Sequence, residues 1–230
     1  MLKILSWNIQ AGGGSRTRSI VSAISKEQAA ILVLSEYRNN DAGIRLRGLL
    51  MKAGYRHQAV TESKANNNSV LIAARIPFAS ELHSMADPIY GNNILSAHFA
   101  AFSVMGVYLP HKKKHVLFSA IKQIIKTADR PYIIAGDYNS GFNHIDQLGS
   151  SFWYSAELAS WADIGYVDAF RLVHQDAKEY SWYSNQGNGF RYDHTYIDEV
   201  LKTIVKDCYY KHAWREQKLS DHSAMVLEVG

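Results

Sequence analysis

The sequence predicts an α/β protein in which short buried strands alternate with amphipathic helices. Residues 31–34 and 132–135 are apolar runs, and such runs are typical of strands buried on both faces. Between them, the apolar residues of 116–125 recur at intervals of three and four, which is the spacing of one helix face. With 47% hydrophobic residues among 230, the chain can bury a large core without disulfide bonds.

Strands and helices follow one another along the first half of the chain. Further segments with strand-like composition are found at 2–7, 69–74, 94–99 and 102–108. The last two are expected to pair as a hairpin. Periodic apolar residues predict helices at 20–30 and 44–53, and Gly54 stands where glycine commonly follows a helix. The glycines 12–14 match no phosphate-binding motif and are expected to form a flexible connection.

The second half continues the alternation and ends in strands. A helix is expected at 153–161, and a turn at 185–189. Strand-like patterns are found at 166–170, 180–184, 190–197, 203–210 and 224–229. No linker, repeat or charge block divides the chain, so a single domain covering 1–230 is expected.

Bulk properties limit where the protein is expected to work. Cys208 is the single cysteine, which excludes an intrachain disulfide and fits a reducing compartment. The sequence shows no signal-peptide pattern, and no apolar run approaches the roughly 20 residues that span a bilayer. We therefore expect a cytoplasmic protein without membrane contact, monomeric and without an obligate protein partner. The net charge of +4 and the pI of about 9.0 allow an anionic partner.

Polar residues gather where the predicted strands end. Asp137 and Asn139 follow the strand at 132–135 at alternate positions, so both side chains can point into one crevice at the carboxyl end of a sheet. An ordinary polar turn would have the same composition. However, six segments show this pattern, which favours a shared site; they carry Asn8, Glu36, Tyr108, Asp137 with Asn139, Asp193, and Asp221 with His222.

Each of these residues also has an interpretation that involves no chemistry. Glu36 fits a solvated loop acid, and Tyr108 fits a core aromatic. Asp193 fits a surface partner of Arg191, and His222 fits a hydrogen-bonded structural histidine. Only their combination along an alternating chain argues for a site, and the intact set argues against a nucleic-acid-binding module that has lost catalysis.

Six short motifs are specific in their order along the chain: SWNIQ, LVLSEYR, VYLPH, AGDYNS, FRYDHTYI and LSDHSAM. They run from residue 6 to residue 225. Together they resemble the endonuclease/exonuclease/phosphatase superfamily, and most closely its exonuclease III-like, abasic-site endonuclease branch. The resemblance implies a four-layer α/β sandwich, in which two packed mixed β-sheets are flanked by helices and the site lies at one end between the sheets.

The resemblance also implies a divalent metal ion. Glu36 matches the family's metal-ligand acid, and Asp221 and Gln10 lie by match at the same end of the site. Oxygen ligands suit Mg²⁺ or Mn²⁺ far better than Zn²⁺. Gln10 stands where many relatives carry Asp or Asn, which implies a weaker or differently hydrated ion.

The catalytic roles implied by the resemblance fit phosphodiester hydrolysis. Asp137 matches the acid that aligns or deprotonates the attacking water, and Asn139 and Asn8 would hold that carboxylate and the phosphate. His222 matches the phosphate-contacting histidine. A carboxylate beside it favours the imidazolium form, and Asp193 matches that partner. Tyr108 would donate its hydroxyl to a phosphate oxygen.

The substrate is expected to be DNA, cut at a phosphodiester by in-line attack of an activated water, as an endonuclease or exonuclease with a role in DNA repair. The residues expected to bind it are Asn8, Arg38, His111, Lys112, Lys113 and Phe190, together with Lys114, Tyr183 and Tyr192. A solvated helix start would explain the lysines equally well, and a packed hairpin the aromatics. Arg38 and His111 replace the Lys and Asn that are commoner in relatives, and the short segment between Tyr108 and Asp137 suggests reduced DNA-penetrating loops. RNA, inositol phosphates and other small phosphoesters remain alternatives.

Overall fold

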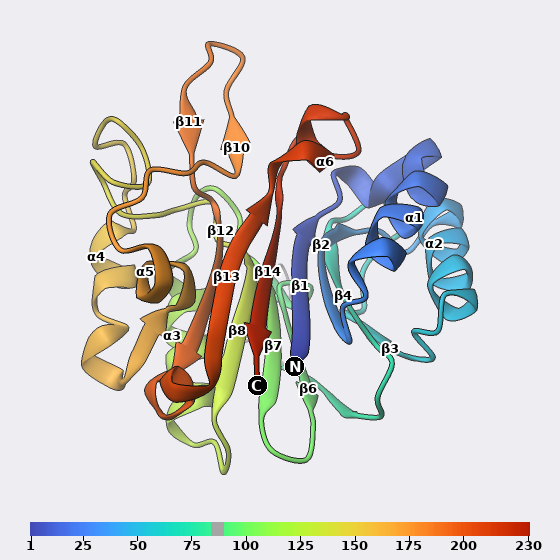
Figure 1. Ribbon diagram of the computed structural model, residues 1–230, viewed down its shortest axis with the longest axis horizontal. Coiled ribbons are helices and arrows are strands. Elements are labelled where there is room, and N and C mark those ends of the chain that lie inside the picture. Colours follow the sequence, from blue (N-terminus) through green and yellow to red (C-terminus); the bar gives the residue numbers. More distant parts are fainter. Residues whose placement is uncertain (84–89) are drawn as a thin grey trace.

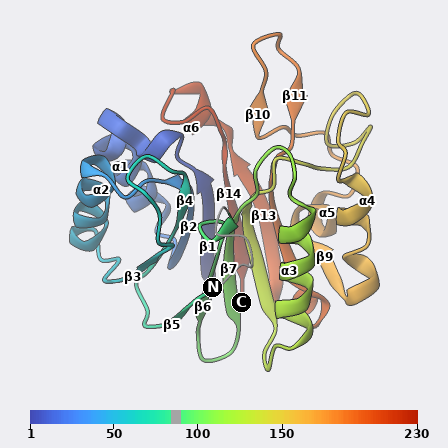
Figure 2. The same ribbon diagram turned by 180° about the vertical axis from the view of Figure 1, so that it is seen from behind.

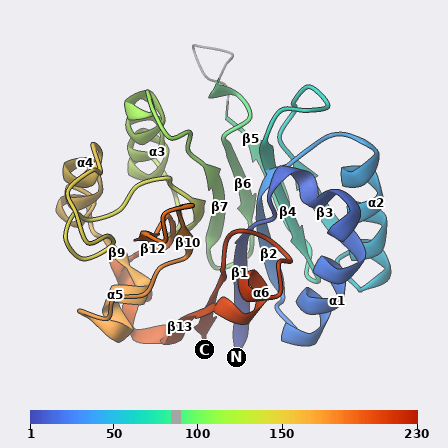
Figure 3. The same ribbon diagram turned by 90° about the horizontal axis from the view of Figure 1, so that it is seen from above.

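The chain folds into two six-stranded sheets that pack face to face, with helices over both outer faces (Figures 1 and 2). The computed structural model describes residues 1–83 and 90–230. Helices α1 (Thr17–Glu27) and α2 (Asp41–Lys52) lie outside one sheet, and α3 (His115–Lys126) and α4 (Ser155–Ala159) lie outside the other (Figure 3). The four-layer α/β sandwich predicted from the sequence is confirmed.

The first sheet consists of β1 (Leu2–Asn8), β2 (Ile31–Tyr37), β3 (His57–Val60), β4 (Ser69–Ala74), β13 (Val205–Lys211) and β14 (Ala224–Val229). Their spatial order is β13–β14–β1–β2–β4–β3. β1 and β2 run parallel, and the other neighbouring pairs are antiparallel. The sheet is therefore mixed, with its parallel pair at the centre.

The second sheet consists of β5 (Ala79–Leu82), β6 (Ile94–His98), β7 (Ser103–Tyr108), β8 (Tyr132–Asp137), β9 (Tyr166–Asp168) and β12 (Asp193–Asp198). Their spatial order is β5–β6–β7–β8–β12–β9, and β7 and β8 form the parallel pair. The predicted hairpin of β6 and β7 is confirmed. The short strands β10 (Trp182–Tyr183) and β11 (Gly189–Phe190) form a separate hairpin at the end of the sandwich opposite both termini (Figure 1).

Local sequence explains where the helices begin and what they bury. The side chain of Asn40 accepts hydrogen bonds from the backbone N–H groups of Ala42 and Gly43, which caps the start of α2. The predicted stripe of α3 packs on the second sheet through Leu117, Phe118, Ile121 and Ile125. Among the described residues, short helices are also found at α5 (Ala169–His174), at α6 (His212–Glu216), and at the 3-10 helices η3 (Ala162–Ile164) and η4 (Glu199–Ile204).

The space between the two sheets is filled by a continuous apolar core, to which Cys208 contributes its buried side chain. Gly106 on β7 faces Val33 and Val70 of the opposite sheet. A Cβ atom at Gly106 would lie 2.7 Å from Cγ1 of Val70 and 3.0 Å from Cγ1 of Val33. Glycine at this position therefore lets the sheets approach closely.

Several elements differ from the sequence prediction. β3 and β5 were not expected, because these edge strands are half-buried or exposed and carry no apolar run. The helix predicted at 153–161 is reduced to the five residues of α4. The strand predicted at 166–170 ends at Asp168, whose side chain accepts hydrogen bonds from the N–H groups of Phe170 and Arg171 and so starts α5.

Two further segments depart from simple periodicity. The strand predicted at 190–197 is interrupted after Phe190, where the N–H group of Arg191 donates to the carbonyl of Asp146 instead of to a strand. The glycines 12–14 are ordered and lie in the 3-10 helix η1 (Ala11–Arg16), each with a positive φ. Among the described residues, no helix has the length and apolar character that a membrane crossing requires.

Candidate active site

The strands that carry most of the predicted site residues reach the end of the sandwich opposite both termini (Figure 1). Strand register brings those of the second sheet together, because Asp137 on β8 lies opposite Tyr108 on β7 and opposite Asp193 on β12. From the first sheet, Asn8 ends β1, and its side-chain amide donates to Oδ2 of Asp137 at 2.9 Å. The site therefore joins the two sheets.

Gly136 makes this register possible. Its φ is +153°, and a Cβ atom there would lie 1.9 Å from the carbonyl oxygen of Val107. Only glycine can therefore occupy this position between the buried strand and Asp137. The close approach of β8 to β7 fixes the backbone from which the Asp137 side chain projects.

Asp137 is buried and held by amides. Its Oδ1 accepts from the backbone N–H of Asn139 at 2.8 Å, and its Oδ2 accepts from the side chains of Asn8 and of Asn139, the latter at 3.2 Å. Burial raises the pKa of the Asp137 carboxyl to about 7, although the positive charge of His222 opposes the rise. The carboxyl can therefore gain or lose a proton near neutral pH.

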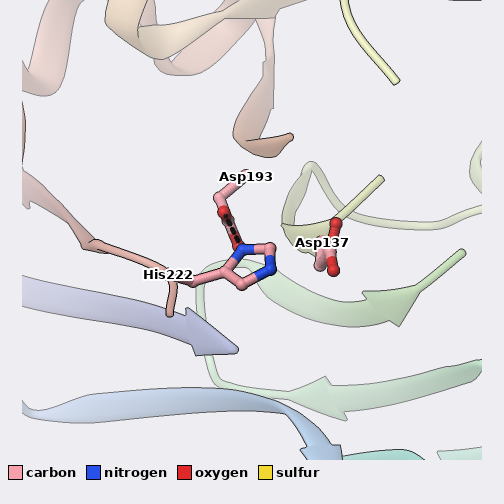
Figure 4. Close-up of side chains that lie close together, drawn as sticks. All are labelled: Asp137, Asp193 and His222. Carbon is pink, nitrogen blue, oxygen red and sulfur yellow. Dashed lines mark hydrogen bonds and ion pairs between the residues drawn. The ribbon is translucent and has the colours of Figure 1, made fainter. Parts of the chain in front are cut away.

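His222 and Asp193 form a buried pair, with Nδ1 of the imidazole 2.7 Å from Oδ2 of the carboxylate (Figure 4). Burial lowers the pKa of His222, but the neighbouring charge of Asp193 outweighs it, and the pKa rises to about 10. The ring is thus an imidazolium at neutral pH. Arg191 is not the partner of Asp193: it is buried and pairs with Asp146 at 2.7 Å and Asp168 at 2.5 Å.

Glu36 is placed by a break in the strand. It lies at a register shift between Ser35 and Tyr37 with a φ of +56°, which is the signature of a β-bulge and turns its side chain toward the site. Its carboxylate accepts from the side chain of Asn8 at 3.2 Å and from the N–H of Ala11 at 2.7 Å. Both carboxylates that Asn8 contacts are therefore fixed relative to one another.

Tyr108 stands beside Glu36. Its hydroxyl lies 3.5 Å from Oε1 of Glu36 and accepts a hydrogen bond from the side chain of Asn68 at 3.1 Å. Burial raises the pKa of the Tyr108 phenol well above its usual range, and the charges of Glu36 and Asp137 add to the rise. The phenol therefore keeps its proton and can act as a hydrogen-bond donor.

Two further predicted metal-site residues, Asp221 and Gln10, lie at the rim. Asp221 is exposed and accepts from the indole N–H of Trp182 at 3.3 Å. The backbone N–H of Gln10 donates to Oδ1 of Asn8, and its carbonyl accepts from Arg16 at 2.7 Å. Burial lowers the pKa of the Arg16 guanidinium, and the negative charges of Asp221 and Glu36 oppose that shift. Both acids therefore lie near Arg16.

The donor set fits a hard cation at the end of the site that carries Glu36. Carboxylate and amide oxygens are the ligands that Mg²⁺ and Mn²⁺ prefer. A second group, Asp137, Asp193 and His222, has ligand atoms within 4.8 Å of one another. In that group Nδ1 of the imidazole is already bonded to Asp193, and the imidazolium would repel a cation. The end with Glu36 is therefore the better candidate.

Two pockets flank these residues. The first, here called the aromatic pocket, has a volume of about 440 Å³ and is lined by Phe152, Trp182, Phe190 and Tyr192, with His111, Lys112 and Asn139 at its polar side. Phe190 stacks on Tyr192 with ring centroids 5.4 Å apart. Tyr183 does not line it. The second, here called the basic pocket, has a volume of about 460 Å³ and is lined by Arg38, Lys112, Lys113, Asn68 and Tyr108, among others.

Lys114 contradicts its prediction. It was expected to face DNA with Lys112 and Lys113, but its side chain is fully buried. Its Nζ donates to the carbonyl oxygens of Tyr138 and Asn139, each at 2.7 Å. Burial lowers the pKa of Lys114 to about 7. Lys112 and Lys113 are exposed, so of the three consecutive lysines only Lys114 lies in the interior.

The sequence interpretation missed three residues that contact the site. Asn68 hydrogen-bonds Tyr108 and accepts from Nε of Arg38 at 2.8 Å, and Trp182 contacts Asp221. Arg16 ties the loop after β1 to the carbonyl of Leu219. Asn68 directly precedes a predicted strand, and this position offered a weak signal. Arg16 and Trp182 carried none, because their contacts are with residues far away in the sequence.

Comparisons with known proteins agree with this geometry. The Endonuclease/Exonuclease/phosphatase family matches residues 5–222. A DNA-(apurinic or apyrimidinic site) endonuclease of Dictyostelium discoideum is 20% identical over 236 residues, which cover 89% of this chain and 64% of that protein. The chain thus spans less than two thirds of this relative's length.

Solved structures show the same fold. An AP endonuclease from Archaeoglobus fulgidus superposes with a TM-score of 0.86 at 21% identity, over 100% of this chain and 99% of its own. The 3′ phosphatase NExo from Neisseria, bound to a product DNA hairpin, gives 0.85 at 19% identity over 100% of both chains. The 3′-5′ exonuclease NExo from Neisseria meningitidis gives 0.83 at 21% identity over 99% of both. Because the family match spans nearly the whole chain, the protein belongs to the endonuclease/exonuclease/phosphatase family.

Proposed function

We propose that the protein is a divalent-metal-dependent phosphodiesterase that acts on DNA. The observation that carries the proposal is that a proton acceptor, Asp137, and a protonated group, His222, lie next to each other in the site. Asp137 has a pKa of about 7 and can accept a proton, while His222 stays protonated beside it. Two titratable groups whose environments separate their roles in this way are typical of acid–base catalysis.

In this mechanism Asp137 takes a proton from the attacking water. Its pKa near 7 suits a general base at neutral pH. Asn139 and Asn8 orient the carboxylate through the hydrogen bonds described above. Because the amide of Asn8 is fully engaged by Asp137 and Glu36, we assign it to holding these acids.

The phosphate would lie between His222 and Tyr108. The imidazolium stabilises the negative charge that develops on the phosphoryl oxygens, and Asp193 keeps it protonated. The protonated phenol of Tyr108 donates a further hydrogen bond to an oxygen. Proton donors held in a buried site need no reorganisation during the reaction, which is the source of their effect.

Glu36, Asp221 and Gln10 would hold the metal ion, expected to be Mg²⁺ or Mn²⁺. When bound, such an ion neutralises charge on the phosphate and on the leaving oxygen. The oxygen donors and the bulge at Glu36 support this assignment. In the bound state, Arg16 would keep the backbone of Gln10 in place.

The two pockets support a nucleic-acid substrate. Arg38, Lys112 and Lys113 line the basic pocket and suit a phosphate backbone. The stacked rings of the aromatic pocket suit an unstacked base or sugar. The DNA-directed names of the relatives agree with DNA as the substrate. A role in DNA repair would follow from that activity, and the free cysteine, Cys208, fits the reducing cytoplasm.

The decisive experiment is digestion of a matched panel with and without Mg²⁺. The panel contains intact duplex, abasic duplex, single-stranded DNA, RNA and an inositol phosphate, and His222→Ala serves as the control for contaminating activity. We expect metal-dependent cleavage of at least one DNA substrate. Hydrolysis of only RNA or only the inositol phosphate would contradict DNA as the substrate. Undiminished hydrolysis in excess chelator would contradict the dependence on a metal ion.

A further inference from the structure

The turn after β8 has a constrained backbone. Asn139 has a φ of +45°, in the left-handed region that residues other than glycine adopt rarely, asparagine more often than most. Such a residue costs about 1–3 kcal/mol, so the surrounding structure must hold it. In this conformation, the backbone N–H and the side chain of Asn139 both reach Asp137, at 2.8 and 3.2 Å.

Lys114 provides two of the contacts that hold this turn, beside the hydrogen bond that the side chain of Asn139 donates to the carbonyl of Leu109 at 2.9 Å. Its Nζ donates to the carbonyls of Tyr138 and Asn139, which are consecutive residues of the turn. The ammonium also lies 5.0 Å from the ring centre of Tyr154. A fully buried ammonium group is costly unless it is hydrogen-bonded, so the lysine and the turn depend on each other.

We propose that Lys114 is a positioning residue for the reaction: its amine fixes the Tyr138–Asn139 turn so that Asn139 holds Asp137 in the orientation that meets the water. This inference rests on the proposed function. Without the amine, two buried carbonyls lose their donor, Asn139 can relax from its left-handed conformation, and Asp137 loses hydrogen bonds to both oxygens. Misplacement of a catalytic group by about 1 Å is enough to lower turnover on the order of 10²-fold.

The chain offers a matched control in Lys113. This residue precedes Lys114 but is exposed and lines the basic pocket. Lys114→Met keeps the length of the side chain and removes the donor, and Lys113→Met makes the same change at the surface. If Lys114 only approached DNA, both variants would raise KM and leave kcat unchanged.

Steady-state kinetics separate these cases. For Lys114→Met we expect kcat to fall on the order of 10²-fold, with KM within about threefold of wild type. For Lys113→Met we expect kcat to be retained and KM to rise. A Lys114→Met variant with normal kcat overturns the proposal.

A double-variant cycle tests whether Lys114 acts through Asn139. In an Asn139→Ala background, Lys114→Met should lower kcat by less than about threefold, because the interaction it supports is already lost. Full additivity of the two losses overturns the proposal. If Lys114→Met does not fold, Lys114→Gln replaces it in the cycle: its carboxamide leaves a polar group near the carbonyls, but it is too short to donate to both as Nζ does, so kcat should still fall and the same non-additivity with Asn139→Ala is expected.

A spectroscopic measurement keeps this inference separate from the activity. The side-chain NH₂ signals of Asn139 should be shifted and slow to exchange in wild type and in Lys113→Met, and fast to exchange in folded Lys114→Met. Unchanged signals in Lys114→Met overturn the proposal. If wild type hydrolyses no phosphodiester, the proposed function fails, while these spectra still decide whether Lys114 fixes the turn.

Discussion

Replacing Asp193 by asparagine tests the charge pairing at the centre of the site. The substitution keeps the shape of the side chain but removes the charge 2.7 Å from Nδ1 of His222. In the wild-type protein, burial lowers the pKa of His222, but the charge of Asp193 outweighs this effect and the pKa rises to about 10. A group whose pKa is raised on folding carries its charge at every pH below that value, so wild-type His222 remains an imidazolium throughout the neutral range.

The expected loss can be worked out from these values. Without Asp193, the charges of Asp137 and Asp221 still oppose the lowering by burial, and the pKa of His222 should fall to roughly its ordinary 6.5, a change worth about 5 kcal/mol at about 1.4 kcal/mol per unit. The imidazolium fraction would then be about 75% at pH 6, about 25% at pH 7 and about 3% at pH 8. Relative to wild type, kcat/KM of Asp193→Asn should drop less than about 2-fold at pH 6, about 4-fold at pH 7 and about 30-fold at pH 8.

The assay is kcat/KM on the best DNA substrate from pH 6 to pH 8.5. Glu179→Gln is the control, because it breaks the partly exposed pair of His212 and Glu179 at 2.9 Å and should leave the profile unchanged. A loss in Asp193→Asn that is the same at every pH would show that Asp193 does not act through the charge of His222.

Three other outcomes are expected. Glu36→Gln should need on the order of tenfold more Mg²⁺ for half-maximal activity, and an unchanged metal titration would exclude Glu36 as a ligand. Replacing Lys112 and Lys113 together by Ala should lower the slope of log affinity against log salt by up to about 2, whereas an unchanged slope would place both outside the DNA contact. Arg191→Met should destabilise the protein by about 3–5 kcal/mol in urea unfolding, because Asp146 and Asp168 lose their buried partner. Arg130→Met, at an exposed pair with Asp129, should change stability little, and equal losses would contradict this account.

The fold and the centre of the site could be predicted because their signals are local. Buried strands such as β8 read as continuous apolar runs, and the residues that follow them, such as Asp137 and Asn139, are polar. Parallel strands end at the same edge of a sheet, which brings Asn8 and Glu36 together after β1 and β2, whereas their meeting with Asp137 of the other sheet was expected from the repeated pattern and the family resemblance.

Other features could not be predicted because packing decides them. Three consecutive lysines look alike in sequence, and only the position of the 138–139 turn determines that Lys114 points inward. The bulge that aims Glu36 depends on the partner strand β4. Arg191 pairs with Asp146 and Asp168 instead of Asp193 because the strand is interrupted after Phe190, and the sequence pattern does not predict this interruption.

The distance between the two sheets determines how the site residues are aligned with one another. Asn8 and Asp137, His222 and Asp193, and Ser35 with the carbonyl of Val107 are each joined by a hydrogen bond that crosses from one sheet to the other. A side chain at Gly106 would act as a wedge against Val70. Core residues that do not contact a substrate therefore contribute to the alignment of the site residues. A methyl group added at Gly106 should lower activity even if the protein still folds.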